Sequence, residues 1–201
     1  MKPLLTLALG AALTLGAGLV QAAATVGQAA PAFTLTDSNG TEHSLADFRG
    51  KTVVLEWFNH ECPFVKKHYG AGNMQRQQET AGKAGVVWLL VNSSAPGKQG
   101  HVDGAQGNRV LGEWKAAPAA LLLDHDGTLG RAYGAKTTPH MFVIDGQGVV
   151  RYNGAIDSTP SADPGDIASS TQFVEAALAD LAANRPVARA TTQPYGCSVK
   201  Y

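Results

Sequence analysis

Four short apolar runs, separated by stretches with helical periodicity, constrain the fold of this 201-residue chain more than any other feature. Each run is rich in β-branched, leucine or aromatic residues, and turn-forming residues bound it, which is typical of a buried strand. The runs are TVVLEWFN (52–59), GVVWLLVN (85–92), AALLLD (119–124) and HMFVID (140–145). Alternation of strands with helices requires crossover connections, so the first part of the sheet should be parallel.

The segments between these runs complete the pattern. A helix should begin at Cys62, because Pro63 suits the first helical position, and it should be interrupted at Gly70 or Gly72. Further helices are expected at 105–116, in the short segment LGRAYGA and at 170–184, and VVRYNGA (149–155) should close a hairpin. We therefore predict an α/β fold whose mixed central sheet is flanked by helices and becomes antiparallel at its end.

The N-terminus predicts a secretory signal peptide over residues 1–22. Lys2 precedes an apolar run that ends in small residues near Ala22, and the run is shorter than the ~20 strongly apolar residues of a spanning helix. We expect an exported protein, periplasmic or secreted, without membrane attachment after cleavage. The mature chain should comprise one domain over 23–184 and an extended, proline-containing tail over 185–201 that carries Cys197.

Charge and motif content exclude several classes of function. The chain has 16 Lys and Arg against 16 Asp and Glu, and no basic run, which argues against a nucleic-acid surface. No glycine-rich dinucleotide fingerprint is present, so we expect no cofactor. Export would place both cysteines where a disulfide can persist, and two cysteines allow one bridge or two free thiols.

Cys62 occupies the position that most favours chemistry, between a strand and the start of a helix. The helix N-terminus should lower the pKa of its thiol, and Lys66, Lys67 and a protonated His60 would help, while Glu61 would oppose them. Burial as a small apolar side chain is the alternative for Cys62. Lys66 and Lys67 would then simply face solvent.

A second feature is TTPHMFVID, in which Pro139 follows Thr138 directly before a strand. A cis peptide bond there would turn the chain sharply, although an ordinary trans proline is also common at a strand start. Taken in order, the strand, the helix-start cysteine, the Thr-Pro, the hairpin and the closing helix resemble the thioredoxin superfamily. The stretches PAFTLTDSNGTEHSLADFRGKTVVLEWF, ECPFVKKHYGAGNMQ and TQPYGCSVKY are similar to peroxiredoxin-like redoxins of the alkyl hydroperoxide reductase/thiol-specific antioxidant group with a Gly-Cys-Ser tail.

The resemblance, over residues 27–184, implies a thioredoxin-like fold and roles for particular residues. Cys62 matches the nucleophilic cysteine, and Pro139 matches the cis-proline that presents backbone groups to a substrate thiol. Glu56 matches a buried acid that relays protons, unless its carboxylate turns outward at a strand edge. The side chains expected around a bound substrate are Thr138, Pro63, His60 and Lys66.

The sequence also departs from these families. Val65 replaces the second cysteine of a Cys-x-x-Cys motif, and Leu55 and Asn59 replace the proline and threonine that bind peroxide in peroxiredoxins. Pro139 stands about where peroxiredoxins place an arginine. We therefore favour thiol–disulfide exchange with a thiol or disulfide protein partner, with thiol-dependent peroxide reduction as the alternative.

Cys197 is the remaining candidate to resolve a mixed disulfide on Cys62. A permanent structural bridge, or two cysteines that never meet, are the other possibilities. A copper or zinc protein and a non-enzymatic binding module are further alternatives. The metal reading would gather His60, Cys62, His68, His140 and Cys197.

Overall fold

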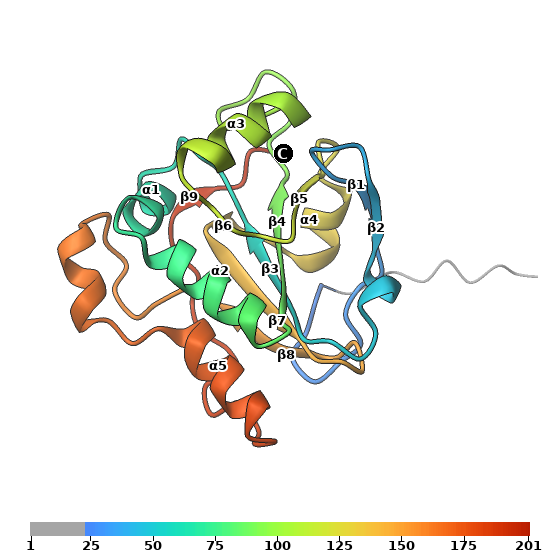
Figure 1. Cartoon of the computed structure of the whole chain (residues 1–201), viewed down its shortest axis with the longest axis vertical. Coiled ribbons are helices and arrows are strands. Elements are labelled where there is room, and N and C mark those ends of the chain that lie inside the picture. The colour runs from blue at the N-terminus through green and yellow to red at the C-terminus, as the bar shows by residue number, and fades with distance from the viewer. Residues whose placement is uncertain (1–22) are drawn as a thin grey trace, which may run out of the picture.

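The computed structural model describes residues 23–201, so the predicted signal peptide lies outside the described residues. A five-stranded mixed sheet, in the order β5-β4-β3-β7-β8, forms its centre (Figure 1). β3 pairs in parallel with β4 and antiparallel with β7, as the sequence predicted. The strands are β3 (Val53–Trp57), β4 (Val87–Asn92), β5 (Ala120–Leu123), β7 (His140–Ile144) and β8 (Val150–Gly154).

The helices fall where they were expected, and they cover both faces of the sheet. They are α1 (Pro63–Gly70), α2 (Asn73–Lys83), α3 (Gly104–Glu113), α4 (Thr128–Tyr133) and α5 (Phe173–Ala182). A small hairpin of β1 (Thr34–Thr36) and β2 (Glu42–Ser44) leads into a 3-10 turn at Leu45–Phe48. A second 3-10 turn, Pro164–Ser169, lies between β8 and α5, where the Asp163 side chain accepts from the Gly165 amide.

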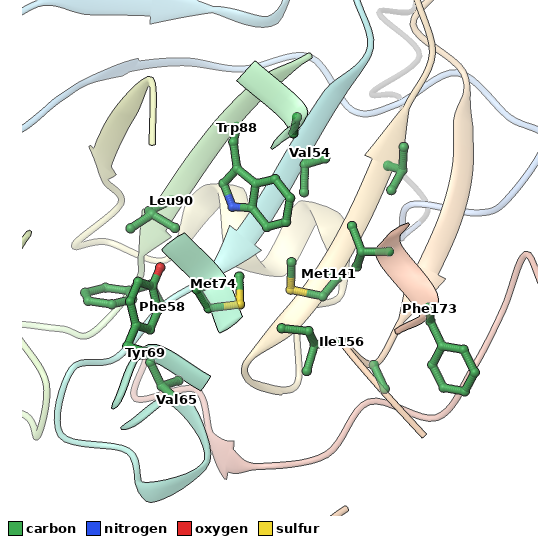
Figure 2. Packing of buried hydrophobic residues seen from close by; sticks show 14 of the residues in the cluster. Val54, Phe58, Val65, Tyr69, Met74, Trp88, Leu90, Met141, Ile156 and Phe173 are labelled. Atoms are coloured by element: carbon green, nitrogen blue, oxygen red, sulfur yellow. The ribbon is translucent and has the colours of Figure 1, made fainter. Parts of the chain in front are cut away.

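The core has two layers, because successive side chains of a strand point to opposite faces of the sheet. On β3, Val54 belongs to the cluster on the α1, α2 and α5 side, while Leu55 and Trp57 belong to the cluster on the other side. Figure 2 shows the first cluster, in which Trp88 and Met141 pack close to Val54. Cys62 is part of this same cluster.

Residues 185–201 form an extended segment that returns from α5 across the sheet edge (red in Figure 1). Thr192 fixes this path: its hydroxyl oxygen accepts from the Ala155 amide at 2.8 Å and lies 2.6 Å from the Tyr152 hydroxyl. Further along, the Ala95 amide donates to the Lys200 carbonyl at 2.8 Å. The tail is therefore held against the domain at its middle and near residue 201.

Two short strands that the sequence did not predict join the tail to the domain. β9 (Cys197–Ser198) pairs antiparallel with β6 (Thr137–Thr138), and Cys197 is opposite Thr138 in this register. Gly196 has a φ of +132°, and a Cβ there would lie 2.1 Å from the Thr138 carbonyl oxygen. Glycine therefore permits the close approach of the tail to this edge.

No helix within residues 23–201 is long and apolar enough to span a bilayer.

Candidate active site

Cys62 lies in the turn that connects the end of β3 to α1, at the N-cap of the helix. Its amide donates to the Asn59 carbonyl at 3.1 Å, and the Asn59 side-chain oxygen accepts from the Glu61 amide at 2.9 Å. Pro63 occupies the first helical position, as predicted, and is exposed. Cys62 itself has no exposed surface.

The Thr138–Pro139 peptide bond is cis, and it lies directly beside Cys62. The Cys62 thiol donates to the Thr138 carbonyl oxygen at 3.1 Å. The Thr138 hydroxyl is buried and has no hydrogen-bond partner among residues 23–201. The Thr138 side chain is one of the groups that lower the pKa of Cys62, since a hydroxyl can donate to a thiolate.

Cys197 reaches Cys62 through the β6–β9 pairing. Both cysteines are free thiols, and Cys197 packs against the core cluster that contains Cys62. Cys62 is buried, whereas Cys197 is half-buried. The possibility that the two cysteines never meet is therefore wrong.

The contact between the thiols shifts their pKa values in opposite directions. Burial alone would raise the pKa of Cys62, but the Cys197 side chain, the amides of Val65 and Cys197, and the Thr138 side chain outweigh it and lower that pKa. Burial, the hydrogen bond to Cys62 and the charge of Cys62 raise the pKa of Cys197 to about 12. Cys62 is thus the thiol that ionises first, which makes it the stronger candidate nucleophile.

Glu56 is buried on β3, so the alternative of an outward-turned carboxylate is wrong. Its Oε1 accepts from the Tyr69 hydroxyl at 3.1 Å, and its Oε2 accepts from the Trp88 indole at 2.9 Å. Burial raises the pKa of Glu56 to about 7, although these donors and Gln78 oppose the rise. A carboxyl group that titrates near neutral pH can both take and release a proton.

His60 and Lys66 lie near Cys62 but are not among the groups that lower its pKa. Burial lowers the pKa of His60, with Glu61 opposing and Lys66 adding to the effect, so the expected histidine cation is wrong at neutral pH. His60 and Glu61 line a polar cavity of about 340 Å³ beside α3, together with Arg109. Lys66 is exposed on α1.

The structure also contains a buried group of residues whose contacts with one another the sequence did not predict. Lys67, expected either to help lower the pKa of Cys62 or to face solvent, is buried, and its ammonium nitrogen lies 3.5 Å from Asp157 Oδ2. The Tyr195 hydroxyl donates to Asp157, and His68 Nε2 lies 3.2 Å from that hydroxyl. We call Lys67, His68, Asp157 and Tyr195 the tail anchor. No local sequence signal joins these residues, because they come from three distant segments.

Two of the three histidines considered as metal ligands, His68 and His140, are engaged in hydrogen bonds. His68 Nδ1 lies 2.9 Å from the Asn73 amide nitrogen, and His140 Nε2 lies 2.8 Å from the Asn153 side-chain oxygen. Burial lowers the pKa of both His68 and His140 to about 4. Within residues 23–201, no group of three or more His, Cys, Asp or Glu side chains is arranged to hold a metal ion.

Comparison with solved structures identifies the fold class of the protein. The chain is similar to an uncharacterised conserved protein from Geobacillus kaustophilus, with a TM-score of 0.76 and 26% identity over 88% of this chain and 92% of that one. The mixed sheet, the flanking helices and the other structural neighbours define a thioredoxin-like fold. The fold class implied by the resemblance is therefore confirmed.

Sequence comparison gives the family. Residues 26–153 match the AhpC/TSA family, and the chain belongs to it. The chain is 30% identical to the thiol-disulfide oxidoreductase ResA of Geobacillus thermodenitrificans over 129 residues, which are 64% of this chain and 68% of that protein. It is 29% identical to a putative peroxiredoxin bcp of Coxiella burnetii over 133 residues, which are 66% of this chain and 81% of that one. The chain is an oxidoreductase of the redoxin type, as predicted.

Proposed function

We propose that the protein is an exported thiol–disulfide oxidoreductase in which Cys62 is the nucleophile and Cys197 resolves the mixed disulfide. The observation that carries the proposal is the meeting of two free thiols through the β6–β9 pairing, with their pKa values shifted in opposite directions. Cys62 ionises more readily and attacks first, whereas Cys197 stays protonated until the mixed disulfide has formed. The name of the ResA relative supports the same chemistry.

The reaction needs two exchanges. The Cys62 thiolate attacks one sulfur of a substrate disulfide, which forms a mixed disulfide and releases the first substrate thiolate. The Cys197 thiol then loses its proton and attacks the Cys62 sulfur, which forms a Cys62–Cys197 disulfide and releases the second substrate thiolate. The substrate gains two electrons, and a partner thiol protein returns two electrons to the enzyme.

Proton movement follows from the same contact. The charge of Cys62 is one reason why the pKa of Cys197 is raised, and this charge disappears once Cys62 is in a mixed disulfide. Cys197 therefore loses its proton more easily in the mixed disulfide than in the reduced protein. Glu56, with a pKa of about 7, is the proposed proton acceptor for this step.

The test compares Cys62→Ser and Cys197→Ser with the parent chain in a dithiol-driven disulfide reduction assay, with mass-tagged alkylation of trapped species. Cys62→Ser should abolish turnover, whereas Cys197→Ser should still attack and should accumulate a mixed disulfide on Cys62. The same mapping on the parent chain should find a Cys62–Cys197 disulfide that opens under mild dithiol. Unchanged turnover in Cys62→Ser would overturn the proposal.

Peroxide reduction is the second candidate, and the complete burial of Cys62 beneath the tail favours it. A small oxidant reaches a buried sulfur more easily than a protein disulfide does. The thiolate would attack a peroxide oxygen and release water or an alcohol, and Cys197 would condense with the resulting sulfenic acid to release water. Rapid sulfenic acid formation on Cys62 of Cys197→Ser, together with slow attack on disulfides, would favour this reaction over exchange.

A further inference from the structure

The tail anchor holds the chain two residues before Cys197. The Tyr195 hydroxyl donates to Asp157 Oδ1, and its ring meets the ring of Phe64 edge to face, with centroids 5.8 Å apart. Gly196 then allows the backbone to cross the Thr138 carbonyl. With so short a connection, the position of Tyr195 fixes the position of Cys197.

The same helix carries the anchor and the nucleophile. Phe64, Lys67 and His68 are spaced i, i+3 and i+4 on α1, so they lie on one face of the helix, and all three approach Tyr195. Cys62 is the N-cap of α1. One helix therefore carries both Cys62 and the residues that hold Tyr195, so it helps to set the distance between the two thiols.

The anchor is built from buried charges, which are costly to keep without a partner. Both side chains of the Lys67–Asp157 pair have no exposed surface. Lys67 also donates to the Thr159 carbonyl at 3.1 Å, and Asp157 Oδ1 accepts from the Thr159 amide at 3.1 Å. Asp157 therefore keeps a hydrogen bond even without Tyr195. The Tyr195 hydroxyl connects the tail to this buried pair through Asp157.

We propose that Tyr195 is a positioning residue that holds the Cys197 thiol against Cys62, through its hydroxyl contact with Asp157 and its ring contact with Phe64. The inference deepens the proposed function and rests on it. It assigns the closeness of the two thiols to the tail anchor, in addition to the two-residue β6–β9 pairing. Release of this contact would let the tail leave the site without any change in α1.

The test uses Tyr195→Phe in the full mature chain, which removes one oxygen and leaves the ring on Phe64. The readout is the equilibrium of the Cys62–Cys197 disulfide with a glutathione redox buffer, which gives the effective concentration of one thiol at the other. We expect this effective concentration to fall roughly tenfold, because a hydrogen bond to a charged group is lost. Tyr195→Ala, which also removes the ring, should lower it further.

Tyr133→Phe is the matched control, because its buried hydroxyl donates to the Pro31 carbonyl at 2.9 Å from the cluster on the other face of the sheet. It should lower the melting temperature but leave the effective concentration within about twofold of the parent value. The rate of Cys62 attack on a small aromatic disulfide, measured in a Cys197→Ala background, should not fall on Tyr195→Phe, because α1 is unchanged and a released tail covers Cys62 less. This rate separates the first exchange from the second.

The outcomes distinguish the two claims. If the parent chain forms the disulfide and Tyr195→Phe shifts the equilibrium no more than Tyr133→Phe does, the positioning role is wrong and the proposed function stands. If the parent chain itself never forms the disulfide, both claims fail. If Tyr195→Phe alone shifts the equilibrium, at a temperature where both variants keep the parent's circular dichroism, the positioning role is supported.

Discussion

The β3–α1 segment (residues 59–66) and the tail (residues 185–201) bring one cysteine each to the same point, but they hold it in different ways. The β3–α1 segment follows the central strand and includes the start of a helix, so Cys62 is fixed by local backbone hydrogen bonds and by the core. The tail has one two-residue strand and depends on separate contacts at Thr192, Tyr195 and Lys200. The fixed cysteine has the lowered pKa, and the cysteine on the tail has the raised pKa.

This difference indicates a division of work. A nucleophile benefits from a rigid surrounding that favours its thiolate, whereas a resolving thiol must be able to leave and return. The burial of Cys62 in the reduced protein also implies that the tail moves before a protein substrate can reach the sulfur. Substitutions in the tail, at Glu56 on β3, at the contact between the two thiols and at Lys66 on α1 test this difference, from the largest expected effect to the smallest.

Gly196→Ala should have the largest effect, because it displaces the tail and leaves the Cys62 segment unchanged. The added Cβ would lie 2.1 Å from a backbone oxygen, and the φ of +132° is unfavourable for alanine. The tail must therefore shift away from β6. We expect the rate of Cys62–Cys197 disulfide formation to fall by roughly a hundredfold, corresponding to about 3 kcal/mol of backbone strain, as measured by quenched alkylation.

Gly112→Ala on α3 is the control for this substitution, since its Cβ would meet nothing within 4 Å. It should leave the rate unchanged. In Gly196→Ala, a small alkylating agent should also reach Cys62 faster than in the parent chain, because the tail no longer covers it. Parent-like protection of Cys62 would show that the tail tolerates the added methyl group.

Glu56→Gln tests the buried acid of β3 through the pH dependence of the free energy of unfolding. The pKa of Glu56 is raised from 4.5 to about 7 by burial, so between these values the folded protein keeps a proton that the unfolded chain has lost. Rising pH therefore favours unfolding across this range. Relative to the parent, Glu56→Gln should gain about 2 kcal/mol in unfolding free energy between pH 5 and pH 8, measured by urea denaturation. Parallel pH profiles would contradict the assignment.

Cys197→Ala tests the contact between the two regions. Without the Cys197 thiol, the Cys62 thiolate loses one hydrogen bond, so the pKa of Cys62 should rise. The fraction of Cys62 present as thiolate at neutral pH should fall by roughly tenfold, since a hydrogen bond to a charged group contributes on the order of 1.5 kcal/mol. Thiolate absorbance followed against pH would measure this. Ser198→Ala, one residue further along the tail, should leave the titration in place.

Lys66→Ala should have the smallest effect, because Lys66 is exposed and is not among the groups that lower the pKa of Cys62. The rate of Cys62 alkylation at neutral pH should stay within about twofold of the parent rate, as expected for a solvated surface charge. A fall of fivefold or more would restore Lys66 to the role that the sequence suggested.

Much of the fold was predictable because its signals are local. The apolar runs predicted the strands of the central sheet, and Cys-Pro predicted the start of α1, since proline fits the first turn of a helix. The strands β6 and β9 were missed because two residues are too few for a period of two to be recognised. The 3-10 turn at Pro164–Ser169 was missed because its segment reads as a polar loop.

The site was less predictable because its key contacts join distant segments. Lys67 reads as a surface residue until Asp157, ninety positions away (157 − 67), is placed beside it. The direction of Glu56 was open because a central strand is buried on both faces, so its sequence carries no alternation that separates inside from outside. The meeting of Cys62 and Cys197 depends on the path of the whole tail.

The separation of the two cysteines along the chain also has a consequence for the unfolded protein. They are 135 positions apart (197 − 62) yet adjacent in space, so a bond between them would turn most of the chain into a covalent ring. Such a ring removes entropy from the unfolded chain worth about 5 kcal/mol in the chain-entropy account. Oxidised protein should therefore migrate faster than reduced protein in a denaturing gel, and the redox state could be followed without any substrate.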